Sequence, residues 1–136
     1  MFRLCVVSST LLWSLFASAH HWVVDMYDEQ TRTTYEMEVV EFRFINPHPF
    51  ITAQIVDRSI EQASEATPDL WTLEMDNRWE LVDLGFTNST FKSGDKILVT
   101  ANPSPYDDRA LYVRALEHPV DGYRYEHNVR HLFKLQ

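Results

Sequence analysis

Two histidines at the start of the expected mature chain are the residues whose types and spacing point most directly to chemistry. His20 and His21 directly follow Ala17-Ser18-Ala19, a leader cleavage signal of the A-x-A type. Cleavage after Ala19 would leave His20 with a free α-amino group beside its imidazole, so that two nitrogens of one residue can chelate one metal ion. A third nitrogen from His48 would complete a T-shaped site of the histidine-brace type. Such a site suits Cu(II), which prefers tetragonal nitrogen ligation and binds most tightly among first-row divalent ions. We therefore expect copper as the metal, with His20, His21 and His48 as its candidate ligands.

A plainer interpretation of these histidines stays open. An amino-terminal His20-His21 pair can be a solvated chain end, and His48 can be a turn residue that hydrogen bonds to the backbone. A second pair, His127 and His131, is four residues apart and would share one face of a helix. The surrounding sequence has no strong helix pattern, so we expect this pair to belong to a solvated tail.

Residues 1–19 have the order of a secretory signal peptide. Arg3 precedes an apolar stretch from Leu4 to Phe16, and the A-x-A site follows. The apolar stretch is about 13 residues, whereas a membrane-spanning helix needs about 20. We expect cleavage, a periplasmic or secreted mature chain of residues 20–136, and no stable membrane insertion afterwards. Cys5, the single cysteine, leaves with the leader, so the domain must fold without disulfides or a thiolate metal site.

The charge of the mature chain limits its partners. One of the 12 Lys and Arg residues lies in the leader and none of the 20 Asp and Glu residues does, which leaves a formal charge of −9. This balance opposes binding to phosphate backbones and anionic lipid, so we expect no nucleic-acid partner. A metal ion, a small ligand or an envelope protein remains compatible.

The patterning of residues 20–136 predicts one all-β domain. Apolar residues alternate from Thr33 and shift phase at Val40, as in a strand that crosses a bulge, and Asn46-Pro47-His48-Pro49 ends that strand. The further expected strands are 50–57, 70–75, 96–101 and 109–116, with a polar stretch over 58–69 and a tail from Tyr123 that has no assigned element. A two-turn helix is expected after Asp76 and Asn77, with Trp79, Leu81, Val82 and Leu84 as its candidate apolar face and Gly85 as its stop. Five strands with a helix between the third and fourth predict a small Greek-key barrel of the OB-like type.

Patterns of catalytic residues are absent from the sequence. It contains no Gly-x-Ser-x-Gly, no phosphate-cradling glycine loop and no His-Glu-x-x-His. Glu74 and Asp76 are two residues apart, so on a strand they would point to the same face, and we expect them to be mainly solvated carboxylates. The many aromatic residues are expected to lie mostly in the barrel core, among them Trp22, Trp71, Trp79, Phe42, Phe44 and Phe50. We therefore expect a binding protein and not an enzyme.

Several short motifs together resemble a family of small exported bacterial proteins of uncharacterised function. Members begin the mature chain near His-His and carry Asn-Pro-His at the end of the first long strand, here His20-His21 and Asn46-Pro47-His48. Further matching pieces are Trp71, Glu74, Gly85-Phe86, Phe91-Lys92-Ser93-Gly94-Asp95 and Asp121-Gly122. The sequence departs from this pattern at Met37, where members tend to have glycine, and in its longer, more basic tail. The resemblance implies export and a small barrel, and it supplies no reaction.

Two functions therefore remain as expectations. The first is an exported periplasmic or cell-envelope module that binds Cu(II) through the mature amino-terminal histidine. The alternative is an interaction module or small-ligand carrier that uses the face of the barrel.

Overall fold

The structure, a computed structural model, describes residues 26–56, 69–127 and 133–134. The expected leader, His20, His21, Trp22 and His131 lie outside the described residues, as do positions 57–68 of the polar stretch. Among the described residues, no helix combines the length and the apolar character needed to cross a membrane.

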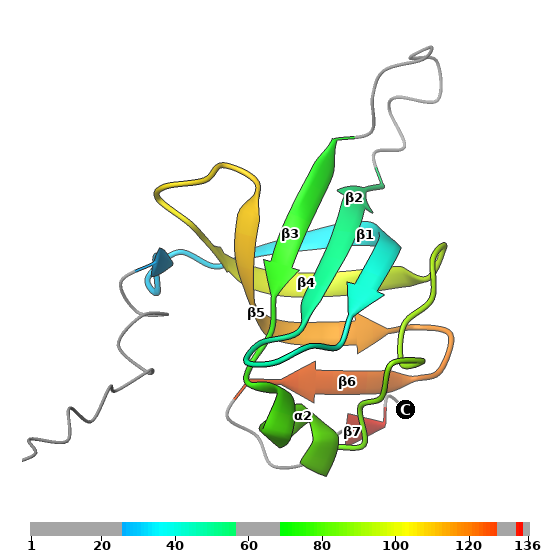
Figure 1. Cartoon of the computed structure of the whole chain (residues 1–136). Helices are drawn as coiled ribbons and strands as arrows, with labels where there is room; N and C mark the ends of the chain where they lie inside the picture. Colours follow the sequence, from blue (N-terminus) through cyan, green and yellow to red (C-terminus); the bar gives the residue numbers. More distant parts are fainter. Residues whose placement is uncertain (1–25, 57–68, 128–132, 135–136) are drawn as a thin grey trace, which may run out of the picture.

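Five strands close into a barrel (Figure 1). They are β1 (Thr33–Arg43), β2 (Phe50–Ile55), β3 (Leu70–Glu74), β4 (Lys96–Pro103) and β5 (Ala110–His118). β1 pairs antiparallel with both β2 and β4, β3 pairs with β2, and β5 pairs with β4. A parallel pairing of β3 with β5, from Thr72–Ala110 to Glu74–Tyr112, closes the ring. The all-β, OB-like barrel with one helix between β3 and β4 is therefore confirmed.

The long first strand crosses a bulge where the phase of its apolar residues changes. The register of β1 against β2 shifts between Val39 and Glu41. Before the shift, Met37 and Val39 point into the core; at the shift, Val40 is exposed. The bulge lets one strand bend and pair with two neighbours, and the phase change in the sequence predicted its position.

The interior of the barrel is filled by alternating side chains from every strand. The buried cluster includes Met37, Val39, Ile51, Leu73, Ile97, Val99, Leu111 and Val113. Trp71 and Phe42 are partly buried against it, and Phe44 is buried. The expectation that these aromatic residues pack in the core is correct, whereas Trp79 is 68% exposed.

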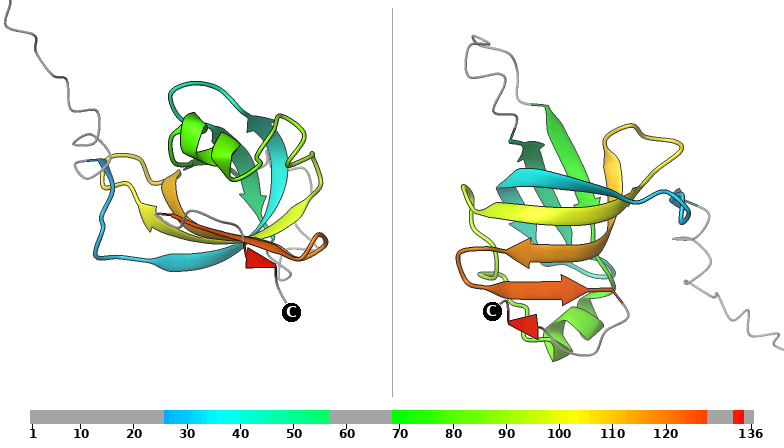
Figure 2. Two further views of the ribbon diagram at one scale, coloured as in Figure 1. Left: turned by 90° about the horizontal axis from the view of Figure 1, so that it is seen from below. Right: turned by 180° about the vertical axis from the view of Figure 1, so that it is seen from behind.

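Part of the tail extends the sheet beyond the barrel. β6 (Tyr123–Glu126) pairs antiparallel with the second half of β5, and β7 (Phe133–Lys134) pairs with β6. β5 accordingly runs two residues further than expected, to His118. Figure 2 shows β6 and β7 continuing the sheet beside β5.

The helix α2 (Arg78–Asp83) begins and ends as the sequence predicts, but it buries a different face. The side chain of Asn77 accepts hydrogen bonds from the backbone N–H groups of Trp79 and Glu80. At the other end, Gly85 has a φ of 88°, and its N–H donates to Val82 while the N–H of Phe86 donates to Leu81. Leu81 is fully buried.

The exposure of Trp79 and Val82 corrects the expected apolar face of α2. Val82 is 40% exposed, and both residues lie on the side of the helix turned away from the core. The helix has only six residues and carries apolar side chains on two sides, so periodicity alone could not select the buried side.

Candidate functional site

The loop between β1 and β2 holds His48 against the start of α2. The backbone N–H of Met75 donates to the carbonyl of Pro49 at 3.0 Å, and that of Arg78 donates to the carbonyl of Pro47 at 2.9 Å. The Arg78 guanidinium also lies 4.7 Å from the ring centre of Phe44 and donates to the Phe44 carbonyl. These contacts fix the loop at the end of the barrel where β3 stops (Figure 1).

His48 is oriented by a carboxylate. Its Nδ1 hydrogen bonds to Oε1 of Glu74, the last residue of β3. Both side chains are mostly shielded, with 22% of His48 and 18% of Glu74 exposed. If Nδ1 donates this bond, Nε2 of His48 carries the free lone pair of the ring, the tautomer in which imidazole binds a metal. Glu74 is therefore not the solvated carboxylate that the sequence suggested.

The second oxygen of Glu74 accepts from the amino-terminal end of the described chain. The Tyr27 hydroxyl donates to Oε2 of Glu74 at 2.7 Å. Burial, reinforced by this hydrogen bond to a carboxylate, raises the pKa of Tyr27 well above its usual range, so the hydroxyl stays a donor. Glu74 thus connects residue 27 to the loop of His48.

The segment that carries Tyr27 is attached to the barrel at several points. The Asp28 N–H donates to the Pro103 carbonyl at 2.8 Å, and the side-chain amide of Asn102 donates to the carbonyls of Asp28 and Thr31. The Tyr27 ring packs on Tyr112 of β5 with centroids 5.4 Å apart. The chain that follows the expected amino terminus is therefore positioned beside the same end of β3.

A second histidine and carboxylate pair lies beside Tyr112. His127, the residue directly after β6, places its Nδ1 2.9 Å from Oδ2 of Asp76 and 3.4 Å from the Tyr112 hydroxyl. Burial alone would raise the pKa of Asp76, but the hydrogen bonds from His127 and from the Asn77 N–H lower it overall. Only 15% of the His127 side chain and 12% of the Asp76 side chain are exposed.

These contacts correct two expectations. His127 is not part of a solvated tail, because β6 brings it to Asp76, and Asp76 is not a solvated carboxylate. His131, the other member of the expected histidine pair, lies outside the described residues. No local pattern predicted the contacts of Tyr27 and Tyr112, which join segments far apart in the chain.

The two pairs and the two tyrosines form one group, which we term the histidine–carboxylate cluster: His48, Glu74, Tyr27, Tyr112, His127 and Asp76. Within the described ranges, no three His, Cys, Asp or Glu side chains are arranged to hold a metal ion. Of the predicted ligands, the structure places His48 in the cluster, and His20 and His21 fall in the part that it leaves undescribed. A metal at His48 would therefore need ligands from outside these ranges.

Comparison with known proteins places the chain in a family. Residues 9–110 match a family model described as a family of unknown function (DUF6152). The chain belongs to this DUF6152 family. The matched region contains Tyr27, His48, Glu74 and Asp76, while Tyr112 and His127 follow it. No curated protein and no solved structure matches the chain.

Proposed function

We propose that this DUF6152 protein is an exported module of the periplasm or cell envelope that binds Cu(II). His20 would chelate the ion through its α-amino group and imidazole, and Nε2 of His48 would supply the third nitrogen. His21 remains a neighbouring candidate ligand. The proposal assigns binding and no reaction to the protein.

The orientation of His48 is the observation that carries this proposal. Histidines that bind metals usually donate their other ring N–H to a carboxylate or a carbonyl, which fixes the tautomer and makes the ligating nitrogen more basic. Glu74 occupies that position on Nδ1 of His48. The mostly shielded Glu74 therefore gives His48 the orientation that a metal ligand needs.

The position of Tyr27 supports the convergence of the two ends of the site. Tyr27 and His48 hydrogen bond to the two oxygens of the same carboxylate. His20 lies seven positions before Tyr27 in the sequence, and seven extended residues span up to about 25 Å. The length of chain between them is therefore sufficient for His20 to reach the ring of His48.

The decisive experiment compares two forms of the chain that differ only at the α-amino group of His20. A chain that begins at His20 and the same chain with its α-amino group acetylated are titrated with Cu(II) and followed by electron paramagnetic resonance. We expect tight nitrogen ligation in the first form and its loss in the second, because acetylation removes the amine as a ligand. Equal affinities and equal spectra would refute the proposal.

Two substitutions test the barrel side of the site in the chain that begins at His20. His48→Ala should weaken Cu(II) binding and remove one nitrogen from the spectrum, while His127→Ala serves as a matched control and should leave both unchanged. Glu74→Gln should weaken binding by about 10- to 100-fold, because the amide stabilises the required imidazole tautomer less well. If His127→Ala weakens binding and His48→Ala does not, the third ligand is assigned wrongly.

Export is tested separately by mass spectrometry of the mature product. We expect His20 as the first residue, which is the condition for the chelate. A different first residue would leave the barrel unchanged and remove the basis for copper binding.

A further inference from the structure

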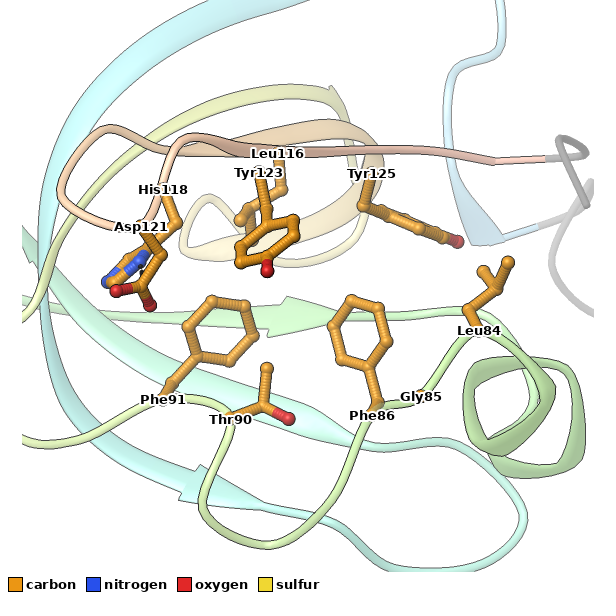
Figure 3. A pocket seen from close by; sticks show the side chains of 10 residues that line it. All are labelled: Leu84, Gly85, Phe86, Thr90, Phe91, Leu116, His118, Asp121, Tyr123 and Tyr125. Carbon is orange, nitrogen blue, oxygen red and sulfur yellow. Dashed lines mark ion pairs between the residues drawn. The ribbon is translucent and has the colours of Figure 1, made fainter. Parts of the chain in front are cut away.

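A pocket of about 390 Å³ lies beside the barrel, away from the contacts of His48. It separates the connection between α2 and β4 from the hairpin of β5 and β6 (Figure 3). Phe86 and Phe91 form one wall, and Leu116, Tyr123 and Tyr125 form the other. This volume is within the range of pockets that hold small molecules.

The walls of the pocket are built mainly from aromatic rings. Phe86 packs edge-on against Tyr125, with centroids 5.8 Å apart, and lies 6.0 Å from Phe91. Both phenylalanines are 5% exposed, whereas Tyr123 is 49% exposed. Figure 3 shows the Tyr123 ring above the two phenylalanines, with its hydroxyl directed between them. A flat ring can therefore pack between fixed aromatic walls, with Tyr123 as the wall open to solvent.

One end of the pocket is negatively charged. His118 lies there with its Nδ1 2.8 Å from Asp121 and its Nε2 3.5 Å from Asp95. Nε2 makes no hydrogen bond within the described residues, so Asp95 is near the ring only as a charge. Two carboxylates beside one imidazole leave a net negative charge even when the imidazole is protonated. Asp121 is the more accessible carboxylate, with 53% of its side chain exposed. The whole chain has a formal charge of −8, which adds to the attraction for cations.

The other end presents a hydroxyl that has no partner. Tyr125 is 3% exposed, and its hydroxyl makes no hydrogen bond within the described residues. Burial raises the pKa of Tyr125 well above its usual range, so the group remains a neutral donor. In Figure 3 this hydroxyl points toward Leu84, at the end opposite His118 and Asp121. A buried hydroxyl without a partner is uncommon in folded proteins, and a polar group on a ligand would satisfy it.

We propose that this pocket binds a small aromatic ammonium ion, with its ring between the phenylalanines and Tyr123 and its ammonium group at Asp121. The faces of Phe and Tyr attract cations, and the carboxylate supplies the opposite charge at one end only. A polar substituent on the far side of the ring would be directed toward the end of the pocket where the Tyr125 hydroxyl lies. This site is independent of the copper proposal, since it uses none of the same residues.

Three probes of matched size test the charge preference on the metal-free chain: tyramine, tyrosol and 4-hydroxyphenylacetate. They carry an ammonium group, a neutral hydroxyl and a carboxylate on comparable phenol rings. Isothermal titration calorimetry should give an affinity for tyramine about tenfold or more above that for tyrosol, and the weakest binding for the anion. Equal binding of tyramine and tyrosol would overturn the proposal, as would no binding of tyramine.

Two isosteric substitutions locate the ammonium group. Asp121→Asn should remove the preference for tyramine over tyrosol. Asp108→Asn makes the same change of charge at an exposed position in the connection from β4 to β5, at the other end of β5, and should preserve the preference. If the two variants behave alike, Asp121 does not bind the ammonium group.

A second pair of variants keeps the test valid if Asp121→Asn unfolds the hairpin. Tyr123→Leu removes a half-exposed aromatic ring and should weaken the binding of tyramine several-fold. Tyr125→Phe keeps the buried ring and removes its hydroxyl. It should weaken the binding of tyramine and leave unchanged the binding of phenethylamine, which lacks the phenolic hydroxyl. Unaltered tyramine affinity in both variants would refute the placement of the ligand in this pocket.

Discussion

Asp76 shows how one buried contact makes the stability of the fold depend on pH. Its pKa lies below the ordinary value of 3.8, because the hydrogen bonds from His127 and the Asn77 N–H outweigh the effect of burial. A carboxylate with a lowered pKa in the folded state contributes stability above its unfolded pKa. That contribution is lost as the pH falls below about 3.8 toward the folded pKa.

We therefore predict that Asp76→Asn reduces the acid sensitivity of the protein. Between pH 5 and pH 3, the free energy of unfolding from urea titrations should fall less steeply for Asp76→Asn than for the wild type. Asp83→Asn, which removes an exposed carboxylate of α2, is the charge-matched control. Identical acid dependence of Asp76→Asn and the wild type would show that the contact with His127 does not stabilise the ionised carboxylate.

The candidate site was predictable from sequence only in part, and single residues show why. His48 stands out because Asn-Pro-His-Pro must end a strand, and Glu74 stands out as a carboxylate at the end of another. The pairing of these two residues depends on the register of β2 against β3, where Phe50 lies opposite Glu74. The contacts of Tyr27 and Tyr112 depend on how an amino-terminal segment packs against β5, and no local pattern encodes that contact.

Among the elements, the barrel strands were predictable and the tail was not. Along each barrel strand, apolar and polar residues alternate over five or more positions, and turn residues bound the segment. This pattern is the strongest local signal for a strand. β6 has only four residues, although Tyr123 and Tyr125 do alternate with Arg124 and Glu126. That alternation, directly after Asp121-Gly122, was the signal available, but its pairing with β5 is set by contacts along the whole hairpin.

The short helix α2 depends on its cap, since it buries only Leu81. The Asn77 side chain accepts from the N–H groups of Trp79 at 2.9 Å and Glu80 at 3.1 Å. We predict that Asn77→Ala lowers the free energy of unfolding by about 1 kcal/mol. Asn88→Ala, at an exposed position in the next turn, is the matched control and should have little effect. The measurement is urea unfolding at neutral pH, and equal stability of the two variants would contradict the role of the cap.

At the scale of the whole molecule, copper binding should couple the amino terminus to the stability of the barrel. A ligand stabilises a fold only to the extent that it binds the folded chain better than the unfolded chain. A chelate formed by His20 alone uses atoms of one residue, so it persists when the barrel unfolds and adds no stability. The proposed third nitrogen, from His48, would be held in position only in the folded state, so this ligand would link metal binding to folding.

We therefore predict that Cu(II) raises the thermal unfolding midpoint of the chain that begins at His20 and leaves that of its His48→Ala variant unchanged. At a free Cu(II) concentration of 100 times the dissociation constant, binding to the folded chain alone would stabilise it by about 2.7 kcal/mol. Cu(II) that binds to His20 in the unfolded chain reduces this stabilisation. Differential scanning calorimetry with Cu(II), with Zn(II) and with a chelator measures the shift for each chain. An equal rise in His48→Ala would mean that the barrel contributes a different ligand. The absence of any rise in the unaltered chain, while Cu(II) still binds at His20, would mean that the amino terminus binds copper independently of the fold.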